Sequence, residues 1–155
     1  MAVAASTIAQ PPRLSSGERR LAWLLRLYAL LFGAGAIVFL LRPDETVQDM
    51  DRVGALLGLS TLAPSGVPVA SDFWLSLAVA NMATIAACCW LASLDVRGRR
   101  ALAYPVVVSK LASSATGILL FVRWTAALPF LVIALVDLPL AFLLVAALRR
   151  ARAWP

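Results

Sequence analysis

The chain has 155 residues, of which 62% are hydrophobic and 14% are charged, whereas ordinary globular domains are about 45–50% apolar and about 25% charged. This composition argues against a water-soluble domain and leaves room for one membrane-embedded bundle without a second folded domain. The net charge of +6 does not indicate a nucleic-acid partner, because the basic residues form small clusters beside apolar segments instead of following one helix face or groove. The frequent alanine and arginine residues favour a bacterial source.

Chemistry-bearing residues are scarce in this sequence. The chain has no histidine, which excludes bis-histidine haem, histidine-ligated chlorophyll, most zinc sites and a Ser-His-Asp triad. Cys88 and Cys89 are adjacent in an apolar run, which suits small buried residues better than a disulfide framework. Because we find no nucleophile–base pair and no glycine-rich phosphate loop, we expect no catalytic residue, no metal, no cofactor and no enzymatic activity.

Residues 1–18 precede the first long apolar run. They begin small and partly apolar, and Pro11, Pro12 and Gly17 follow before the spans start. A secretory signal has its positively charged region first and its apolar region second, so this order does not fit one. We therefore expect a flexible cytoplasmic tail.

Four long apolar segments come next, each bounded by charge, proline or both. They cover residues 21–41, 73–94, 101–122 and 126–148. About twenty apolar residues cross about 30 Å of hydrocarbon, so each segment predicts a transmembrane helix. Four buried helices of a soluble protein are the alternative, but no segment has a long polar face. The sequence predicts an all-α, integral membrane four-helix bundle within residues 19–150.

The first span carries Leu24-Leu25-Arg26-Leu27 and Phe32-Gly33-Ala34-Gly35. These residues resemble the opening helix of DoxX-like bacterial four-helix membrane proteins. The resemblance covers this span alone and contains no diagnostic motif, so it implies a membrane bundle and assigns no functional residue.

The longest connection, residues 42–72, is acidic and is expected outside the cytoplasm. Its start, Pro43-Asp44-Glu45-Thr46, is typical of a helix N-terminus, and we predict a short amphipathic surface helix over about residues 44–58. The predicted apolar face is Val47, Met50, Val53 and Leu57, with Gln48, Asp49, Asp51 and Arg52 pointing elsewhere. Such a helix serves either as a cover over the bundle or as a lid over a ligand entrance.

The arginines predict the orientation of the bundle. Ten of them flank the two chain ends and the connection between the second and third spans: Arg13, Arg19, Arg20, Arg26, Arg97, Arg99, Arg100, Arg149, Arg150 and Arg152. The opposite side has three, Arg42, Arg52 and Arg123. By the positive-inside rule the ten-arginine side is cytoplasmic, which predicts a multi-pass protein of the inner (plasma) membrane with both termini in the cytoplasm.

The tryptophans predict the same boundaries independently. Trp23, Trp90 and Trp154 fall near the expected inner interface, and Trp74 and Trp124 fall near the outer one. Indole rings prefer the headgroup level of a bilayer, so we interpret these five residues as interface anchors.

Two charged residues lie near the middle of predicted spans. Lys110 is 14 residues before Trp124 and Asp137 is 13 residues after it, and the connection at this point is so short that the two helices must be antiparallel neighbours. At a rise of 1.5 Å per residue the two depths differ by about 1.5 Å. Because a charge at a helix centre costs about 2.5–3.5 kcal/mol on insertion scales, we predict an ion pair between Lys110 and Asp137.

Other polar residues are expected around this pair, with Asn81 somewhat to the outer side of the level of Lys110. We define the polar seam as Lys110, Asp137, Asn81, Ser113, Ser114 and Thr84. Pro129 and Pro139 fall inside the fourth predicted helix, where each removes a backbone donor. Pro139 frees the carbonyl of Leu135, two residues from Asp137, and a kink there would widen a polar pocket. The seam is interpreted either as a structural ion pair with its hydrogen bonds or as a proton, ion or headgroup site.

Three functions are compatible with the sequence. The first is a non-catalytic subunit or scaffold of a larger membrane complex, which its small size, apolar exterior and small-residue patches favour. The second is a small transporter or channel-like module that uses the Lys110–Asp137 pair. The third is a protein that binds a lipid, a quinone or a pigment in a groove under the 44–58 helix. The expected partners are the lipid bilayer and either another membrane protein or further copies of this chain.

Overall fold

The computed structural model describes residues 14–62 and 72–152, which are helical apart from short connections. The elements are α1 (Ser16–Leu41), α2 (Pro43–Leu56), α3 (Asp72–Leu94), the 3-10 turn η1 (Arg100–Leu102), α4 (Ala103–Arg123) and α5 (Leu128–Arg152). In this part of the chain four helices are long and apolar enough to cross a membrane, namely α1, α3, α4 together with η1, and α5. The predicted all-α four-helix membrane bundle is confirmed, with α2 as the short helix between the first two spans.

Helix α1 begins at Ser16, ahead of the predicted span. Ser15 and Glu18 form a capping box, in which the Glu18 amide donates to the Ser15 hydroxyl (3.2 Å) and the Ser15 amide donates to the Glu18 carboxylate (2.7 Å). These bonds satisfy amides that the first helical turn leaves without partners. Residues 1–13 of the predicted tail lie outside the described residues.

An ion pair joins the start of α1 to the connection between α3 and α4. The Arg97 guanidinium donates to both Glu18 carboxylate oxygens, at 2.6 and 2.8 Å. The hydrogen bond to Glu18 is the main reason that the pKa of Arg97 lies above its usual value. A bidentate arginine–carboxylate pair fixes orientation as well as distance, so it holds this end of the bundle in register.

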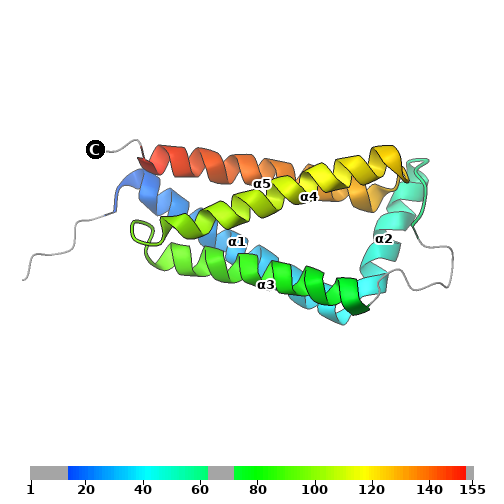
Figure 1. Ribbon diagram of the computed structural model, residues 1–155, viewed down its shortest axis with the longest axis horizontal. Coiled ribbons are helices and arrows are strands. Elements are labelled where there is room, and N and C mark those ends of the chain that lie inside the picture. Colours follow the sequence, from blue (N-terminus) through cyan, green and yellow to red (C-terminus); the bar gives the residue numbers. More distant parts are fainter. Residues whose placement is uncertain (1–13, 63–71, 153–155) are drawn as a thin grey trace, which may run out of the picture.

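The helices are arranged as two pairs (Figure 1). Helix α1 packs along α3, and α4 packs along α5, while α1 also contacts α5. Helix α3 meets α4 mainly at the end where η1 connects them, and the two helices diverge toward the other end. Helix α2 lies across that other end, between the two pairs, whereas the start of α1 and the end of α5 lie together at the opposite end.

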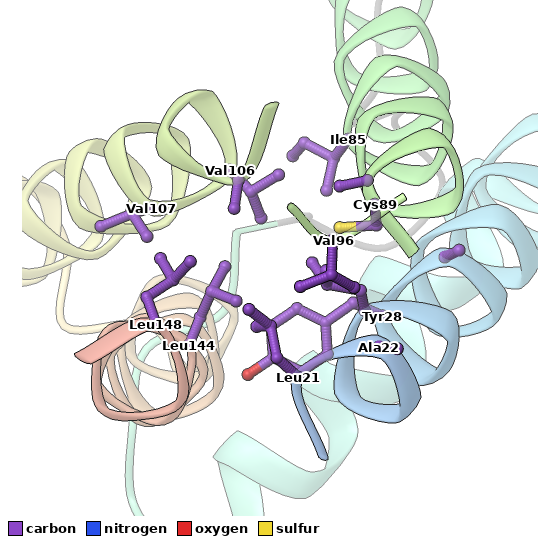
Figure 2. Packing of buried hydrophobic residues seen from close by; sticks show 14 of the residues in the cluster. Leu21, Ala22, Tyr28, Ile85, Cys89, Val96, Val106, Val107, Leu144 and Leu148 are labelled. Carbon is purple, nitrogen blue, oxygen red and sulfur yellow. The ribbon is translucent and has the colours of Figure 1, made fainter. Parts of the chain in front are cut away.

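The hydrophobic core cluster occupies the half of the bundle that holds the start of α1 and the end of α5. Figure 2 shows how its residues pack. Tyr28, Leu21 and Leu25 of α1 are almost completely buried there, against Val106 of α4 and Leu144 of α5. In α3 the buried residues begin at Ile85, and none of its described residues before this point is buried. The divergence of α3 and α4 therefore starts near the level of Ile85, close to the middle of α3.

Helix α2 turns toward the bundle a face that agrees only in part with the predicted one. Val47 and Met50 are half-buried, but Val53 and Leu57 are exposed, and the buried residues are Asp51 and Gly54. A methyl group on Gly54 would lie only 2.8 Å from the Leu128 Cβ, so the helices touch at the glycine. The prediction was wrong at Val53 and Leu57, because the closest contact is made through a glycine and through an acid that serves as a hydrogen-bond acceptor.

The buried acid fixes the segment that follows α2. The Leu62 amide donates to the Asp51 carboxylate (2.8 Å), and the Ser60 amide donates to the Ala126 carbonyl (3.0 Å). Buried polar groups of this kind are tolerated where they satisfy backbone donors. The first bond holds this segment against α2, and the second ties it to the connection between α4 and α5.

Candidate functional site

Lys110 and Asp137 face each other between α4 and α5. The Lys110 ammonium lies 3.1 Å from each Asp137 carboxylate oxygen. Both residues are buried, with 5% of Lys110 and 8% of Asp137 exposed. The predicted ion pair is confirmed. Neighbouring antiparallel helices with a short connection bring equal depths together, so the residue count from Trp124 was sufficient to find it.

Two hydroxyl groups of α4 complete the hydrogen bonding around the pair. The Ser113 hydroxyl contacts the Asp137 carboxylate and also lies 3.1 Å from the Lys110 carbonyl oxygen. Since a hydroxyl has one hydrogen, it serves one of these acceptors at a time. The buried Ser114 hydroxyl donates to the Lys110 carbonyl oxygen at 2.7 Å.

Aromatic residues of α1 cover the pair from the side of the core. The Lys110 ammonium lies 4.1 Å from the centroid of the Phe32 ring, a cation–π contact. The Tyr28 hydroxyl donates to the Leu140 carbonyl oxygen of α5 at 2.7 Å, and its ring meets that of Phe32 edge to face. The sequence did not indicate either aromatic residue, because nothing in a helix of apolar residues marks the ring that faces a charge on another helix.

Asn81 and Thr84 of the polar seam lie apart from the ion pair. The Asn81 side-chain amide contacts the Ser109 hydroxyl at 3.4 Å, and the hydroxyl lies equally far from the Asn81 oxygen. These distances are long for hydrogen bonds. The Thr84 hydroxyl donates to the Ala80 carbonyl of its own helix at 2.8 Å. The structure therefore joins Ser113 and Ser114 to Lys110 and Asp137, and it places Asn81 and Thr84 on an exposed part of α3.

A groove lies where α3 and α4 diverge, and we call it the α3–α4 groove. Its volume is about 360 Å³. It is lined by Asn81, Ser109, Ala112, Ser113, Thr116, Gly117, Leu120, Phe130 and Ile133. Ser109 and Thr116 were not predicted, although Thr116 follows Ser113 at the helical spacing that would have placed it on the same face. Through Ser113, the groove reaches the edge of the Lys110–Asp137 pair.

The floor of the α3–α4 groove depends on Gly117. A methyl group at this position would lie 2.6 Å from the Phe130 carbonyl oxygen, so α4 and α5 approach closely through the glycine. Close backbone approach at small residues is typical of packed membrane helices. The contact fixes the level at which Phe130 and Ile133 close the groove.

The two prolines of α5 have different positions. Pro129 is the second residue of the helix, where its missing N–H has no intrahelical acceptor to lose. The prediction that it interrupts the helix interior is therefore wrong. Pro139 does lie inside the helix, two residues after Asp137, and frees the Leu135 carbonyl from its usual donor. Leu135 is exposed, so this carbonyl lies on the outer side of α5.

The predicted interface tryptophans are exposed where their side chains are described. Trp23, Trp90 and Trp124 have 69%, 50% and 82% of their surfaces exposed, and the Arg26 guanidinium lies 5.6 Å from the Trp23 ring centroid. The side chain of Trp74 and residue Trp154 lie outside the described part. Their role as interface anchors stays a prediction.

The described residues contain no candidate metal site, and both cysteines pack in or against the hydrophobic core. In residues 14–62 and 72–152, no group of three or more histidine, cysteine, aspartate or glutamate residues could hold a metal ion. Cys89 is fully buried in the core beside Tyr28, and Cys88 packs against the same core. Both cysteines are free thiols.

Comparisons with protein-family models, with curated proteins and with solved structures give no match for this chain. These comparisons therefore add nothing to the resemblance between the first span and DoxX-like proteins. The structure thus defines a small multi-pass membrane protein with four apolar helices, a buried ion pair between α4 and α5, and a groove beside α4 that is lined in part by hydroxyl and amide side chains.

Proposed function

We propose that the protein is a non-catalytic subunit or scaffold of a larger membrane complex, and that the α3–α4 groove receives a transmembrane helix of the partner. One observation carries the proposal. The Asn81 amide is exposed near the middle of α3, and its polar contact in the described part of the chain is the long one with Ser109. Hydrocarbon offers no hydrogen bonds, so an exposed amide at this depth favours a protein neighbour.

The groove has the form that a neighbouring helix requires. Thr116 is exposed at the edge of the groove. Gly117 and Ala112 also line it, and these small residues leave room for a neighbouring helix. Small and hydroxylated residues allow helices to approach closely and to bond across their interface. An occupant with one polar side chain at the depth of Asn81 would satisfy the amide, and an apolar occupant would not.

The transporter interpretation finds less support in the geometry of the pair. Lys110 and Asp137 neutralise each other, and Ser113 and Phe32 occupy the space beside them. A transported ion would first have to break a buried pair, and removing one partner of such a pair costs about 3–5 kcal/mol. A bound quinone, pigment or lipid in the α3–α4 groove remains the alternative occupant to be separated by experiment.

We also propose that the end of the bundle that holds the start of α1, the α3–α4 connection and the end of α5 faces the cytoplasm of a bacterial cell. The arginine clusters support this orientation, because positive charge is retained on the cytoplasmic side. Helix α2, with Asp44, Glu45 and Asp49, would then cover the outer end of the bundle. Accessibility of a cysteine placed at position 49 to an impermeant reagent in whole cells tests this orientation.

Site-specific photo-crosslinking tests the partner. In one variant a photoreactive residue replaces Thr116 in the groove. In a control variant it replaces Phe142, which is exposed on α5 but does not line the groove. We expect discrete protein adducts from position 116 in native membranes and none from position 142. Mass spectrometry of the adduct distinguishes a different polypeptide from a second copy of this chain.

Two substitutions on α3 sharpen this test. Asn81→Leu should reduce the adduct about 5- to 30-fold, because an interhelical hydrogen bond contributes about 1–2 kcal/mol in membranes. Thr84→Val is the matched control, since the Thr84 hydroxyl is satisfied within its own helix. Lipid adducts alone at position 116, together with recovery of a lone monomer from every gentle detergent, would remove the subunit proposal.

A further inference from the structure

A second groove lies at the arginine-rich end of the bundle, between the start of α1 and the end of α5. We call it the α1–α5 groove, and its volume is about 510 Å³. Figure 1 shows these two helix ends side by side. They are close because Gly17 meets the α5 backbone, where an added methyl group would lie 3.1 Å from the Arg150 carbonyl oxygen.

Two arginines line the polar end of this groove. Arg20 of α1 and Arg150 of α5 both line it, and neither belongs to an ion pair among the described residues. The nearest acid along α1, Glu18, is engaged by Arg97 through both carboxylate oxygens. The groove therefore carries two positive charges that no carboxylate in the described chain neutralises.

The other wall of the α1–α5 groove is apolar. Leu24 lies one turn further into the membrane than Arg20, and Leu143, Ala146 and Ala147 continue the wall along α5. The two alanines leave space beside the helix that a larger side chain would fill. Positive charge at one end with an apolar wall running from it toward the bundle interior matches the division of a phospholipid into headgroup and acyl chain.

We propose that the α1–α5 groove binds an anionic phospholipid, with the phosphate between Arg20 and Arg150 and an acyl chain along Leu24 and Leu143. Guanidinium groups bind phosphate through paired, charge-assisted hydrogen bonds. Basic pockets between transmembrane helices are suited to anionic headgroups. This site is separate from the α3–α4 groove and does not depend on the proposed partner.

The surface beside the groove favours a lipid over a soluble anion. Arg20 also lines a neighbouring groove of about 720 Å³, together with Arg19, Trp23 and Leu27. Trp23 is 69% exposed, and an exposed indole is typical of the headgroup level. The arginines thus lie where a bilayer presents its phosphates, with apolar surface on the membrane side.

Native mass spectrometry of the full, delipidated chain in detergent tests the proposal. The probes are phosphatidylglycerol and phosphatidylcholine with identical acyl chains. We expect tighter binding of phosphatidylglycerol and an about 10-fold or larger loss of its affinity in the Arg20→Gln/Arg150→Gln double variant. The matched control is Arg99→Gln/Arg149→Gln, which removes the same charge at the same end from residues that do not line the groove. The affinity of this control for phosphatidylglycerol should differ from that of the unsubstituted chain by less than about 2-fold.

A third variant tests the apolar wall with both arginines present. Ala146 is exposed and lines the groove, so Ala146→Phe should fold, fill the groove and weaken phosphatidylglycerol binding by about 10-fold. This variant also decides the matter if the arginine variant does not fold. Equal losses in the two arginine variants, unchanged binding by Ala146→Phe, or displacement of the lipid by inorganic phosphate at equal concentration would each overturn the proposal.

Discussion

The Lys110 ammonium is held between two groups on two other helices: it lies 3.1 Å from both Asp137 carboxylate oxygens on α5 and 4.1 Å from the Phe32 ring centroid on α1. One side chain of α4 therefore connects three helices near the membrane middle. It does so at the level where the apolar core ends and α3 and α4 begin to separate. The ion pair thus holds α4 to α5, and the cation–π contact holds α4 to α1, at the level where α3 no longer packs closely against α4.

The first prediction concerns the pair itself. Lys110→Met or Asp137→Leu alone should destabilise the bundle by about 3–5 kcal/mol, because each leaves one charge buried without its partner. The double variant should recover most of this loss. The measurement is the fraction of monodisperse protein after heating in detergent. A double variant no more stable than either single variant would show that the pair does more than neutralise itself.

The second prediction separates the ring from the carboxylate. Phe32→Leu should lower the free energy of unfolding by about 1–3 kcal/mol, because it removes a desolvated cation–π contact and some packing. In the Lys110→Met background only the packing loss should remain. Phe142→Leu is the control, since Phe142 is exposed. The same thermal assay applies, and an equal effect of Phe32→Leu in both backgrounds would contradict a cation–π contribution.

The third prediction tests the close approach of α4 and α5. Gly117→Ala places a methyl group 2.6 Å from the Phe130 carbonyl oxygen and should destabilise the bundle by about 1–3 kcal/mol. At Gly33 of α1 the added methyl group would have Ala86 as its nearest neighbour at 4.0 Å. Gly33→Ala should therefore be neutral or stabilising by up to about 1 kcal/mol. Thermal midpoints of the two variants that move in the same direction would contradict this packing.

The fourth prediction concerns the cover formed by α2. Gly54→Ala forces the α2 backbone away from Leu128, whose Cβ would lie 2.8 Å from the new methyl group. We expect faster amide hydrogen exchange across α2, while exchange in the core helices stays unchanged, since α2 lies outside the core. Ala55→Ser, at an exposed neighbouring position, is the control. Unchanged exchange in α2 would show that the contact at Gly54 does not hold the helix.

The parts of the structure that the sequence predicted depend on strong local signals. Four long apolar runs predict four spans, and two charges at equal depth beside a short connection predict their own pairing. The inner face of α2 was not predicted, because Asp51 and Gly54 have no apolar side chain to count. The divergence of α3 and α4 was not predicted either, since a helix that is apolar all round carries no stripe to show which side packs.

Within the candidate site, the sequence located the residues but not all of their contacts. Ser113 and Ser114 follow Lys110 at helical spacing, which was sufficient to place them beside the pair. Asn81 lies at a similar depth, yet it faces Ser109 because the angle between α3 and α4 sets which residues meet. That angle depends on packing of the whole core and not on spacing along one helix.

The divergence of α3 and α4 also bears on how the proposed complex would assemble in the plane of the membrane. Exposed residues near the middle of α1 and α5, such as Leu30, Leu31, Val136 and Phe142, are apolar, and the groove that contains Asn81 and Thr116 lies where α3 and α4 diverge. If the proposed partner helix occupies this groove, the molecule has a valency of one. It is suited to assemblies of fixed stoichiometry that stop growing once this groove is occupied, and not to extended lateral arrays.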